Sequence, residues 1–184
     1  MHKHLPKFND NSYAHFITAR TCDSRPYFKN DEFACILCEE LKFYSQGYGF
    51  ALLGYVIMPD HKHLLLWWDK EEKPELSVSK IMQSIKSGSA RRIIDLMKSK
   101  GLEQVLQPTR REGRLQATRN RDSYPKSHRR NLKYRFWQPG FYDFNVYNEA
   151  KLIEKLDYMH NNPVKAGLVV SPSDYDWSSY KEYF

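Results

Sequence analysis

The chain has 184 residues, a length that suits one domain with a hydrophobic core. Its 13 Tyr, 10 Phe and 4 Trp exclude an intrinsically disordered chain. No apolar run is long enough to span a membrane, and the N-terminus lacks the apolar core of a signal peptide, so we expect a cytoplasmic protein. Three cysteines, an odd number, fit a reducing compartment.

The formal net charge of +7 is concentrated in one segment. Residues 109–135 hold ten Lys and Arg against two acidic residues, a net charge of +8, so the rest of the chain sums to −1. Such a block is typical of a solvated segment, or of one that contacts polyanions. Composition therefore favours nucleic acid as the partner, and a basic insertion without a role is the alternative. The candidate phosphate contacts in this block are Arg110, Arg111, Arg129 and Arg130.

The first half of the chain predicts a strand, a helix and a hairpin. The expected elements are a strand over 11–22, a helix from 31 to about 45, a strand over 50–58 and its antiparallel partner over 61–68. Asn30 or Asp31 can cap the helix, and Gly47 and Gly49 can end it. A Pro-Asp pair at 59–60 forms the tight turn of the hairpin.

The second half predicts a long helix, the basic insertion, a strand and a last helix. The expected elements are a helix from about 77 to 101, a strand over 136–147 and a helix from 149 to about 161. Asn148 can cap the last helix, and Pro163 can stop it. The polar face of the 77–101 helix could contact phosphates or could be an ordinary solvated surface; its basic residues include Lys80, Lys86, Arg91 and Arg92.

The order of these elements is β-α-β-β-α-(insertion)-β-α. It predicts an α+β fold, a ferredoxin-like split β-α-β with an antiparallel sheet backed by helices. The whole chain would form a single domain interrupted by the basic insertion at about 109–135. In this layout the strand over 61–68 is central.

Two histidines stand at the start of that strand, separated by one residue. Side chains alternate faces along a strand, so His61 and His63 are expected to point the same way. Two adjacent imidazoles are a suitable pair of metal ligands. The alternative is two solvated histidines on a hairpin.

Tyr158 and Asn162 lie four residues apart near the end of the last helix. They would share a face if the helix continues that far. A tyrosine hydroxyl beside a side-chain amide can combine a nucleophile with an oxygen ligand for a metal. A tyrosine at helical spacing is, however, more often a core or capping residue.

Three segments in this order resemble the single-tyrosine HUH transposases, and within them the REP-associated tyrosine transposases. They are YVIMPDHKHLLLW at 55–67, FWQPGFYDF at 136–144 and LDYMHNNPVKAGLV at 156–169, and the tail DYDWSSY at 174–180 is similar too. The resemblance implies His61, His63 and Asn162 as ligands of Mg²⁺ or Mn²⁺, and Tyr158 as the nucleophile. Two departures are the charged Lys62 at a position that is usually apolar, and the long basic insertion.

The resemblance further implies a DNA-binding transposase that cleaves and rejoins single-stranded, hairpin-containing DNA through a 5′-phosphotyrosine intermediate. Tyr142, Phe144 and Trp137 could stack on unpaired bases, although core packing is the more common fate of such residues. The protein would act as a monomer or a homodimer. Two other functions stay open: a non-catalytic module that binds single-stranded nucleic acid, and a hydrolase that uses a metal-bound water.

Overall fold

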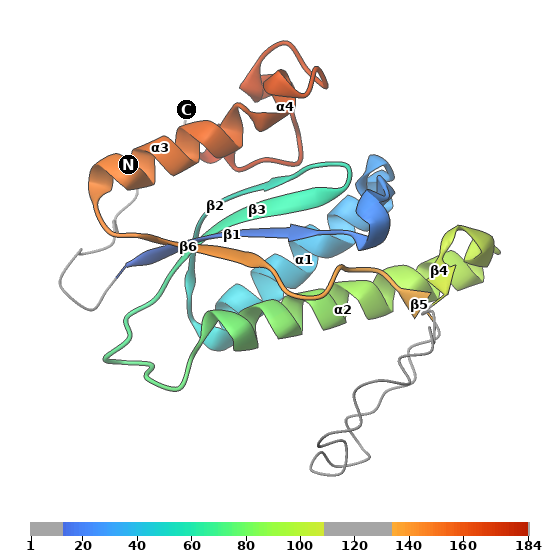
Figure 1. Ribbon diagram of the computed structural model, residues 1–184, viewed down its shortest axis with the longest axis horizontal. Helices are drawn as coiled ribbons and strands as arrows, with labels where there is room; N and C mark the ends of the chain where they lie inside the picture. The colour runs from blue at the N-terminus through green and yellow to red at the C-terminus, as the bar shows by residue number, and fades with distance from the viewer. Residues whose placement is uncertain (1–12, 109–133, 184) are drawn as a thin grey trace, which may run out of the picture.

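The protein is built on a four-stranded antiparallel sheet. The computed structural model describes residues 13–108 and 134–183. The strands are β1 (Ala14–Arg20), β2 (Ala51–Ile57), β3 (His61–Trp67) and β6 (Tyr142–Val146), in the spatial order β2-β3-β1-β6 (Figure 1). The histidine-bearing strand β3 is therefore central, as predicted. This order, with its intervening helices, confirms the ferredoxin-like fold.

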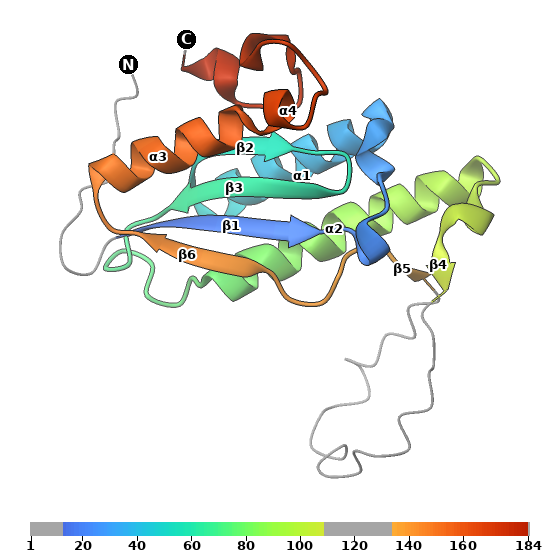
Figure 2. The ribbon, with the colours of Figure 1, turned by 45° about the horizontal axis from the view of Figure 1, so that its top comes forward.

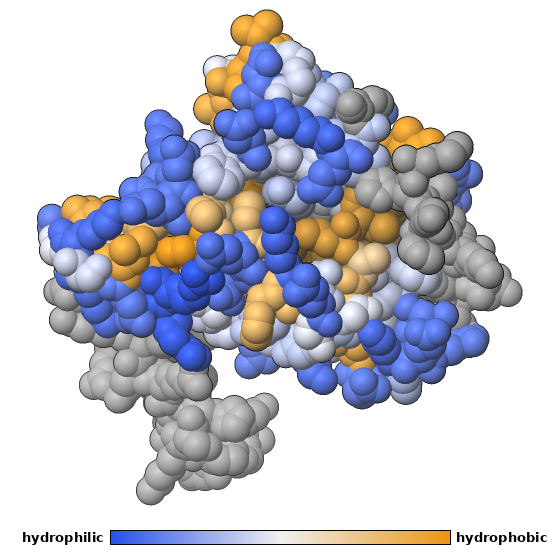
Figure 3. Space-filling model, turned by 180° about the vertical axis from the view of Figure 1, so that it is seen from behind, coloured by the Kyte–Doolittle hydropathy of each residue, from blue (hydrophilic) through white to orange (hydrophobic). Residues whose placement is uncertain are grey.

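Helices cover both faces of the sheet. α1 (Asp31–Tyr48) and α2 (Val78–Ser99) lie against one face, and α3 (Glu149–His160) lies against the other (Figure 2). From behind, the surface is mostly hydrophilic with apolar side chains grouped between polar ones (Figure 3). Within the described ranges, none of the helices is long and apolar enough to cross a membrane.

The predicted helix starts are fixed by local capping. The side chains of Asn30, Ser77 and Asn148 each accept a hydrogen bond from a backbone N–H in the first turn of α1, α2 and α3. Gly49 ends α1 in the left-handed conformation, with a φ of 64°. α1 consequently extends to Tyr48, slightly beyond the expected end.

Period-two alternation divides the apolar residues of the strands between two cores. On the α1 and α2 face, Ile17, Leu64 and Leu66 are fully buried. On the α3 face, Phe16 and Leu65 pack in a second cluster together with α3 residues. Alternate residues of β1 and β3 thus serve opposite cores, and the α3 face is the one that carries His63 and Tyr158.

Lys62 lies on the face opposite its two histidine neighbours, and it is completely buried. Its Nζ atom stands 4.7 Å from the ring centroid of Trp137 and has no hydrogen-bond partner among the described residues. Burial lowers the pKa of Lys62 well below its usual range, and nearby Lys86 lowers it further. Lys62 therefore lies in the core between the sheet and helices α1 and α2.

The strand predicted over 136–147 is shorter in the structure. β6 begins at Tyr142, because the turn at 138–141 interrupts the extended chain, with Gly140 at a φ of 73°. Phe136 and Trp137 are buried instead, and Trp137 forms only an isolated bridge with Thr21. The remaining short elements are 3-10 turns at Cys22–Ser24, Tyr27–Lys29, Glu103–Val105, Pro172–Asp174 and Tyr180–Glu182, helix α4 (Asn162–Lys165), and the paired strands β4 (Gln107–Pro108) and β5 (Tyr134–Arg135).

The last helix ends within one residue of its predicted end at about Asn161. α3 ends at His160, before the proline, and Pro163 lies in the first turn of α4. A proline fits the first turn of a helix because the N–H that it lacks has no partner within the helix there. The break falls at Asn161, whose backbone keeps a helical conformation with φ −84° and ψ −4°.

The C-terminal segment runs along the outer edge of β2 and joins it to α3. The backbone N–H of Ile57 donates to the carbonyl of Trp177 (2.8 Å), and that of Ser179 donates to the carbonyl of Tyr55 (2.9 Å). At Gly54, an added Cβ would lie 2.7 Å from the side chain of Met159. Glycine therefore lets α3 lie close to β2 at this point.

Candidate active site

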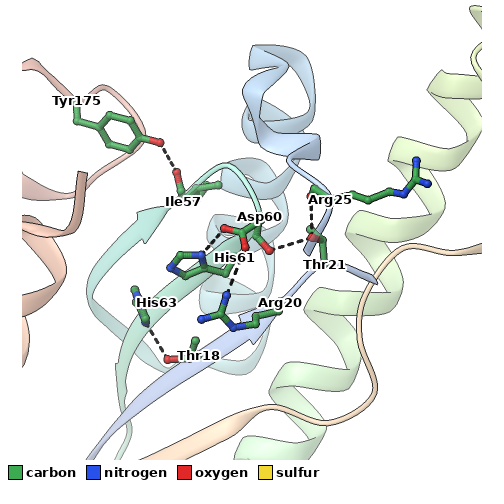
Figure 4. Close-up of polar contacts among 9 residues, drawn as sticks. All are labelled: Thr18, Arg20, Thr21, Arg25, Ile57, Asp60, His61, His63 and Tyr175. Atoms are coloured by element: carbon green, nitrogen blue, oxygen red, sulfur yellow. Dashed lines mark hydrogen bonds and ion pairs between the residues drawn. The ribbon is translucent and has the colours of Figure 1, made fainter. Parts of the chain in front are cut away.

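The two histidines of β3 lie side by side on the α3 face of the sheet (Figure 4). Their ring centroids are 4.9 Å apart, with the rings nearly perpendicular. In the antiparallel pairing with β1, His61 is opposite Arg20 and His63 is opposite Thr18. The strand register thus supplies a second set of polar side chains to the same surface.

His63 is a buried imidazole with one nitrogen held and the other unpaired. Nδ1 lies 2.8 Å from the Thr18 hydroxyl oxygen. Nε2 is buried and has no hydrogen-bond partner among the described residues. Burial is the main reason that the pKa of His63 falls to about 3, with smaller contributions from His61 and Arg20. The ring is therefore neutral, and donation from Nδ1 to Thr18 would leave a lone pair on Nε2.

His61 is oriented by the residue before it. Its Nδ1 atom lies 2.6 Å from Oδ1 of Asp60, and the other carboxylate oxygen accepts a hydrogen bond from Arg20 (3.3 Å) (Figure 4). The Asp60 carbonyl accepts from both the backbone N–H and the hydroxyl of Thr21. A carboxylate that holds one nitrogen of an imidazole directs the other nitrogen outward as a potential ligand.

Tyr158 of α3 completes this group. Its ring stands edge-on to His63, with centroids 5.5 Å apart, and edge-on to Phe16 at 5.9 Å. The side chain stays accessible, with 43% of Tyr158 exposed. The Nζ atom of Lys165 lies 5.5 Å from the centroid of the ring. An accessible phenol beside a histidine and a cation is suited to attack an anionic group.

Asn162, the fourth predicted site residue, opens α4 and is half-buried. The helix breaks at Asn161, so Tyr158 and Asn162 belong to two different helices. The condition under which their spacing would place them on one helix face is therefore not met. The Nδ2 atom of Asn162 is buried and has no hydrogen-bond partner among the described residues. Rotation of the amide by 180° exchanges its nitrogen and oxygen and would place the oxygen, a potential metal ligand, at that buried position.

These residues fit a divalent cation. Each histidine has its Nδ1 engaged, and Asn162 and His63 each bury a polar atom with no partner in the described part of the chain. Imidazole nitrogen with amide oxygen is a ligand set that first-row divalent metals accept. No cluster of three His, Cys, Asp or Glu side chains that could hold a metal occurs in residues 13–108 and 134–183. Asn162 as the third ligand stays a prediction.

Helix α2, which carries the predicted basic residues, covers the opposite face of the sheet from α3, the helix that carries Tyr158 (Figure 2). Lys86 donates hydrogen bonds to the carbonyls of Gln138 and Gly140, both at 2.6 Å. Arg92 forms ion pairs with Glu39 and Glu40 of α1. Both side chains are thus engaged within the protein, and their role in DNA binding stays a prediction.

The other predicted phosphate contacts are less constrained. Lys80 places its Nζ atom 5.6 Å from the ring centroid of Tyr48, and Arg91 is exposed. Arg110, Arg111, Arg129 and Arg130 lie outside the described residues.

Sequence reasoning missed Thr18, Arg20 and Asp60. Asp60 has a local signal, because it directly precedes His61 in the turn between two predicted strands. Thr18 and Arg20 have none, because their partners lie more than 35 residues away and depend on strand register.

Comparison with known proteins defines the class. The family described as "Transposase IS200 like" matches residues 9–106, more than half of the chain, and the chain belongs to this family. This confirms the resemblance seen in the sequence. Over 135 residues the chain is 27% identical to a Haemophilus influenzae protein named "Putative REP-associated tyrosine transposase". That match covers 73% of this chain and 61% of the relative, so the chain spans about three-fifths of the relative's length.

The fold is also similar to a solved structure of a REP-associated tyrosine transposase bound to a REP hairpin. The TM-score is 0.63 at 17% sequence identity, and the match covers 99% of this chain and 84% of that one. At this level of identity, the likeness is one of fold.

Proposed function

We propose that this protein cleaves and rejoins single-stranded DNA by transesterification at Tyr158. The phenol oxygen attacks the phosphorus of a phosphodiester and forms a bond to it, while the bond from phosphorus to the 3′ oxygen breaks. The phenol proton passes to solvent, and the departing 3′ oxygen takes up a proton. The product is a 5′-phosphotyrosine and a free 3′-hydroxyl, which can attack later to rejoin a strand.

The observation that carries this proposal is the position of Tyr158 against His63. An exposed phenol lies beside a buried, neutral imidazole whose Nε2 atom has no partner among the described residues. A structural tyrosine would be expected to bury its ring and hydrogen-bond its hydroxyl. The ring of Tyr158 is instead open to solvent at the edge of this buried imidazole.

His61, His63 and Asn162 would hold a Mg²⁺ or Mn²⁺ ion. Such an ion, when bound, neutralises charge on phosphate oxygens and so favours attack by an oxygen nucleophile. Asp60 and Thr18 would keep the two imidazoles oriented and in the tautomer with a free Nε2 lone pair. Lys165 adds positive charge beside Tyr158, and Arg20, which forms an ion pair with Asp60, adds a second cation near His61; such charge favours an anionic substrate.

The proposed substrate is single-stranded DNA that contains a hairpin. The net charge of +7 supports a polyanionic partner, and family membership supports DNA. The similar solved structure is of a transposase bound to a REP hairpin, and we extend that substrate class to this chain as part of the proposal.

The test is formation of a covalent protein–DNA adduct. End-labelled stem-loop DNA with unpaired arms is incubated with the protein and Mn²⁺ or Mg²⁺, and the products are separated on a denaturing protein gel. We expect a metal-dependent shifted band that is absent in Tyr158→Phe. Tyr147→Phe, which changes another exposed tyrosine beyond the end of β6, is the matched control and should retain the band.

Two outcomes would contradict the proposal. Cut DNA without a protein-linked band, with activity retained in Tyr158→Phe, would indicate a hydrolase that uses a metal-bound water. Salt-dependent binding without cutting, across a panel of hairpins, would indicate a non-catalytic nucleic-acid-binding module.

A further inference from the structure

A single row of residues crosses the sheet from His63, the histidine beside Tyr158, to the outer strand β6. Thr18 is paired with His63 on one side and with Tyr142 on the other. Residues directly opposite one another in an antiparallel sheet project from the same face. Because the Thr18 hydroxyl contacts His63, Tyr142 must lie on the same face as the candidate active site.

The neighbouring row confirms this orientation. Phe16 is paired with Phe144 of β6, and the Nζ atom of Lys155 lies 5.5 Å from the Phe16 ring centroid and 4.7 Å from that of Phe144. Phe16 also contacts the ring of Tyr158. Phe144 and Tyr142, two residues apart on β6, therefore form an aromatic shelf beside the site, with a lysine above its inner part.

Tyr142 is the exposed end of this shelf. It is 58% exposed, whereas Phe144 is half-buried and Trp137, the third aromatic residue of this region, is buried in the core on the other face. Packing in the protein core thus explains why Trp137 is aromatic, and it explains much of the role of the Phe144 ring. It leaves the ring of Tyr142 open to solvent on the surface that carries the nucleophile.

We propose that Tyr142 stacks on an unpaired nucleobase within a few nucleotides of the scissile phosphate. This inference rests on the proposed function and adds to it a base-binding position. Strands lie about 4.8 Å apart, so Tyr142 on β6 is separated from His63 on β3 by about 10 Å. Since a single strand advances at least about 3.4 Å per nucleotide, that span corresponds to a base only a few nucleotides from the cleaved bond.

Charge around the shelf favours this occupant. Arg20, whose side chain is 49% exposed, is paired in register with His61 at one end, and Lys155 stands over Phe144 at the other. A DNA strand needs both cationic groups for its phosphates and an aromatic plane for its bases. Stacking on an aromatic ring accepts any base, so the position would bind DNA without selecting its sequence.

The probe for this proposal is a stem-loop oligonucleotide with unpaired thymidine arms, in which 2-aminopurine replaces one thymidine at a time. We expect the wild-type protein to quench 2-aminopurine fluorescence at one or two adjacent arm positions. Tyr142→Phe should keep the quenching, because the ring is retained. Tyr142→Ala should lose it and should weaken binding by about 5-fold to about 100-fold.

Tyr147→Ala is the matched control, because Tyr147 is 56% exposed but lies past the opposite end of β6. It should behave as wild type in both quenching and affinity. Quenching that survives in Tyr142→Ala would overturn the inference, as would an equal loss in Tyr147→Ala.

The adduct assay separates this inference from the proposed function. If the adduct forms but the quenching does not depend on Tyr142, the base-binding position is rejected and the proposed function is retained. Quenching that depends on Tyr142, without an adduct under any metal condition, would reject the strand-transfer function and leave the base-binding position standing. Absence of any binding to the probe would overturn both.

Discussion

The hydroxyl oxygen of Ser179 lies 3.0 Å from Nε2 of His160, and this buried contact ties the C-terminal segment to the helix that carries Tyr158. The same hydroxyl accepts a hydrogen bond from the backbone N–H of Tyr55 on β2 (2.9 Å). Ser179 is only 1% exposed and therefore joins three segments at one point. The position of α3 against the sheet depends on this junction, together with its close approach at Gly54.

Ser179→Ala should accordingly loosen α3. The change leaves the Tyr55 N–H and His160 without this partner, so we expect the free energy of unfolding to fall by about 1–3 kcal/mol. Adduct formation should slow more than DNA binding weakens, because the nucleophile is displaced. Thermal unfolding and adduct kinetics measure the two effects. Ser173→Ala, at an exposed position in the same segment, is the control, and equal stability of the two variants would argue against the junction.

Asp60→Asn should weaken metal binding without unfolding the protein. The change removes the carboxylate charge that holds Nδ1 of His61, and loss of such a partner typically costs about 10-fold to about 100-fold in metal affinity. Calorimetric titration with Mn²⁺ gives the affinity directly. Asp69→Asn, in the loop after β3, should bind the metal as the wild type does. Unchanged Mn²⁺ affinity in Asp60→Asn would show that His61 needs no such support.

Thr18→Val tests the support of His63. Valine keeps the shape of threonine but removes the hydroxyl, which leaves Nδ1 of a buried imidazole unpaired. We expect a loss of about 1–3 kcal/mol in the free energy of unfolding and weaker Mn²⁺ binding. Thr18→Ser restores the hydroxyl and should recover most of both. If valine and serine behave alike in denaturant unfolding and titration, the hydrogen bond has no such role.

Lys62→Met should stabilise the protein. The buried Lys62 amino group has no hydrogen-bond partner in the described residues, and its burial lowers its pKa and disfavours the charged form. Methionine keeps a similar length and removes the buried polar atom. We therefore expect the free energy of unfolding, measured by urea denaturation at neutral pH, to rise by about 1–3 kcal/mol. Lys98→Met, on the exposed surface of α2, should change stability little. A destabilised Lys62→Met would mean that the contact with Trp137 outweighs the cost of burial.

Local sequence was enough for most of the fold. Caps at Asn30 and Asn148 and the apolar periodicities predicted the three main helices and the hairpin, because these signals act within a few residues. The prediction failed at the start of β6. There the bend at Gly140 interrupts the extended chain, and the strand begins only at Tyr142.

The sequence by itself determined that His61 and His63 share a face, since side chains alternate along any strand. It also marked Tyr158 and Asn162 through their motif. Only the tertiary structure decided that Thr18, Arg20 and Tyr142 lie on the same face as these histidines. It also decided that Lys86 and Arg92 contact other parts of the protein, and that Lys62 is buried. The physical reason is that strand register and helix docking bring together residues far apart in the chain, and no local pattern encodes which residues will meet.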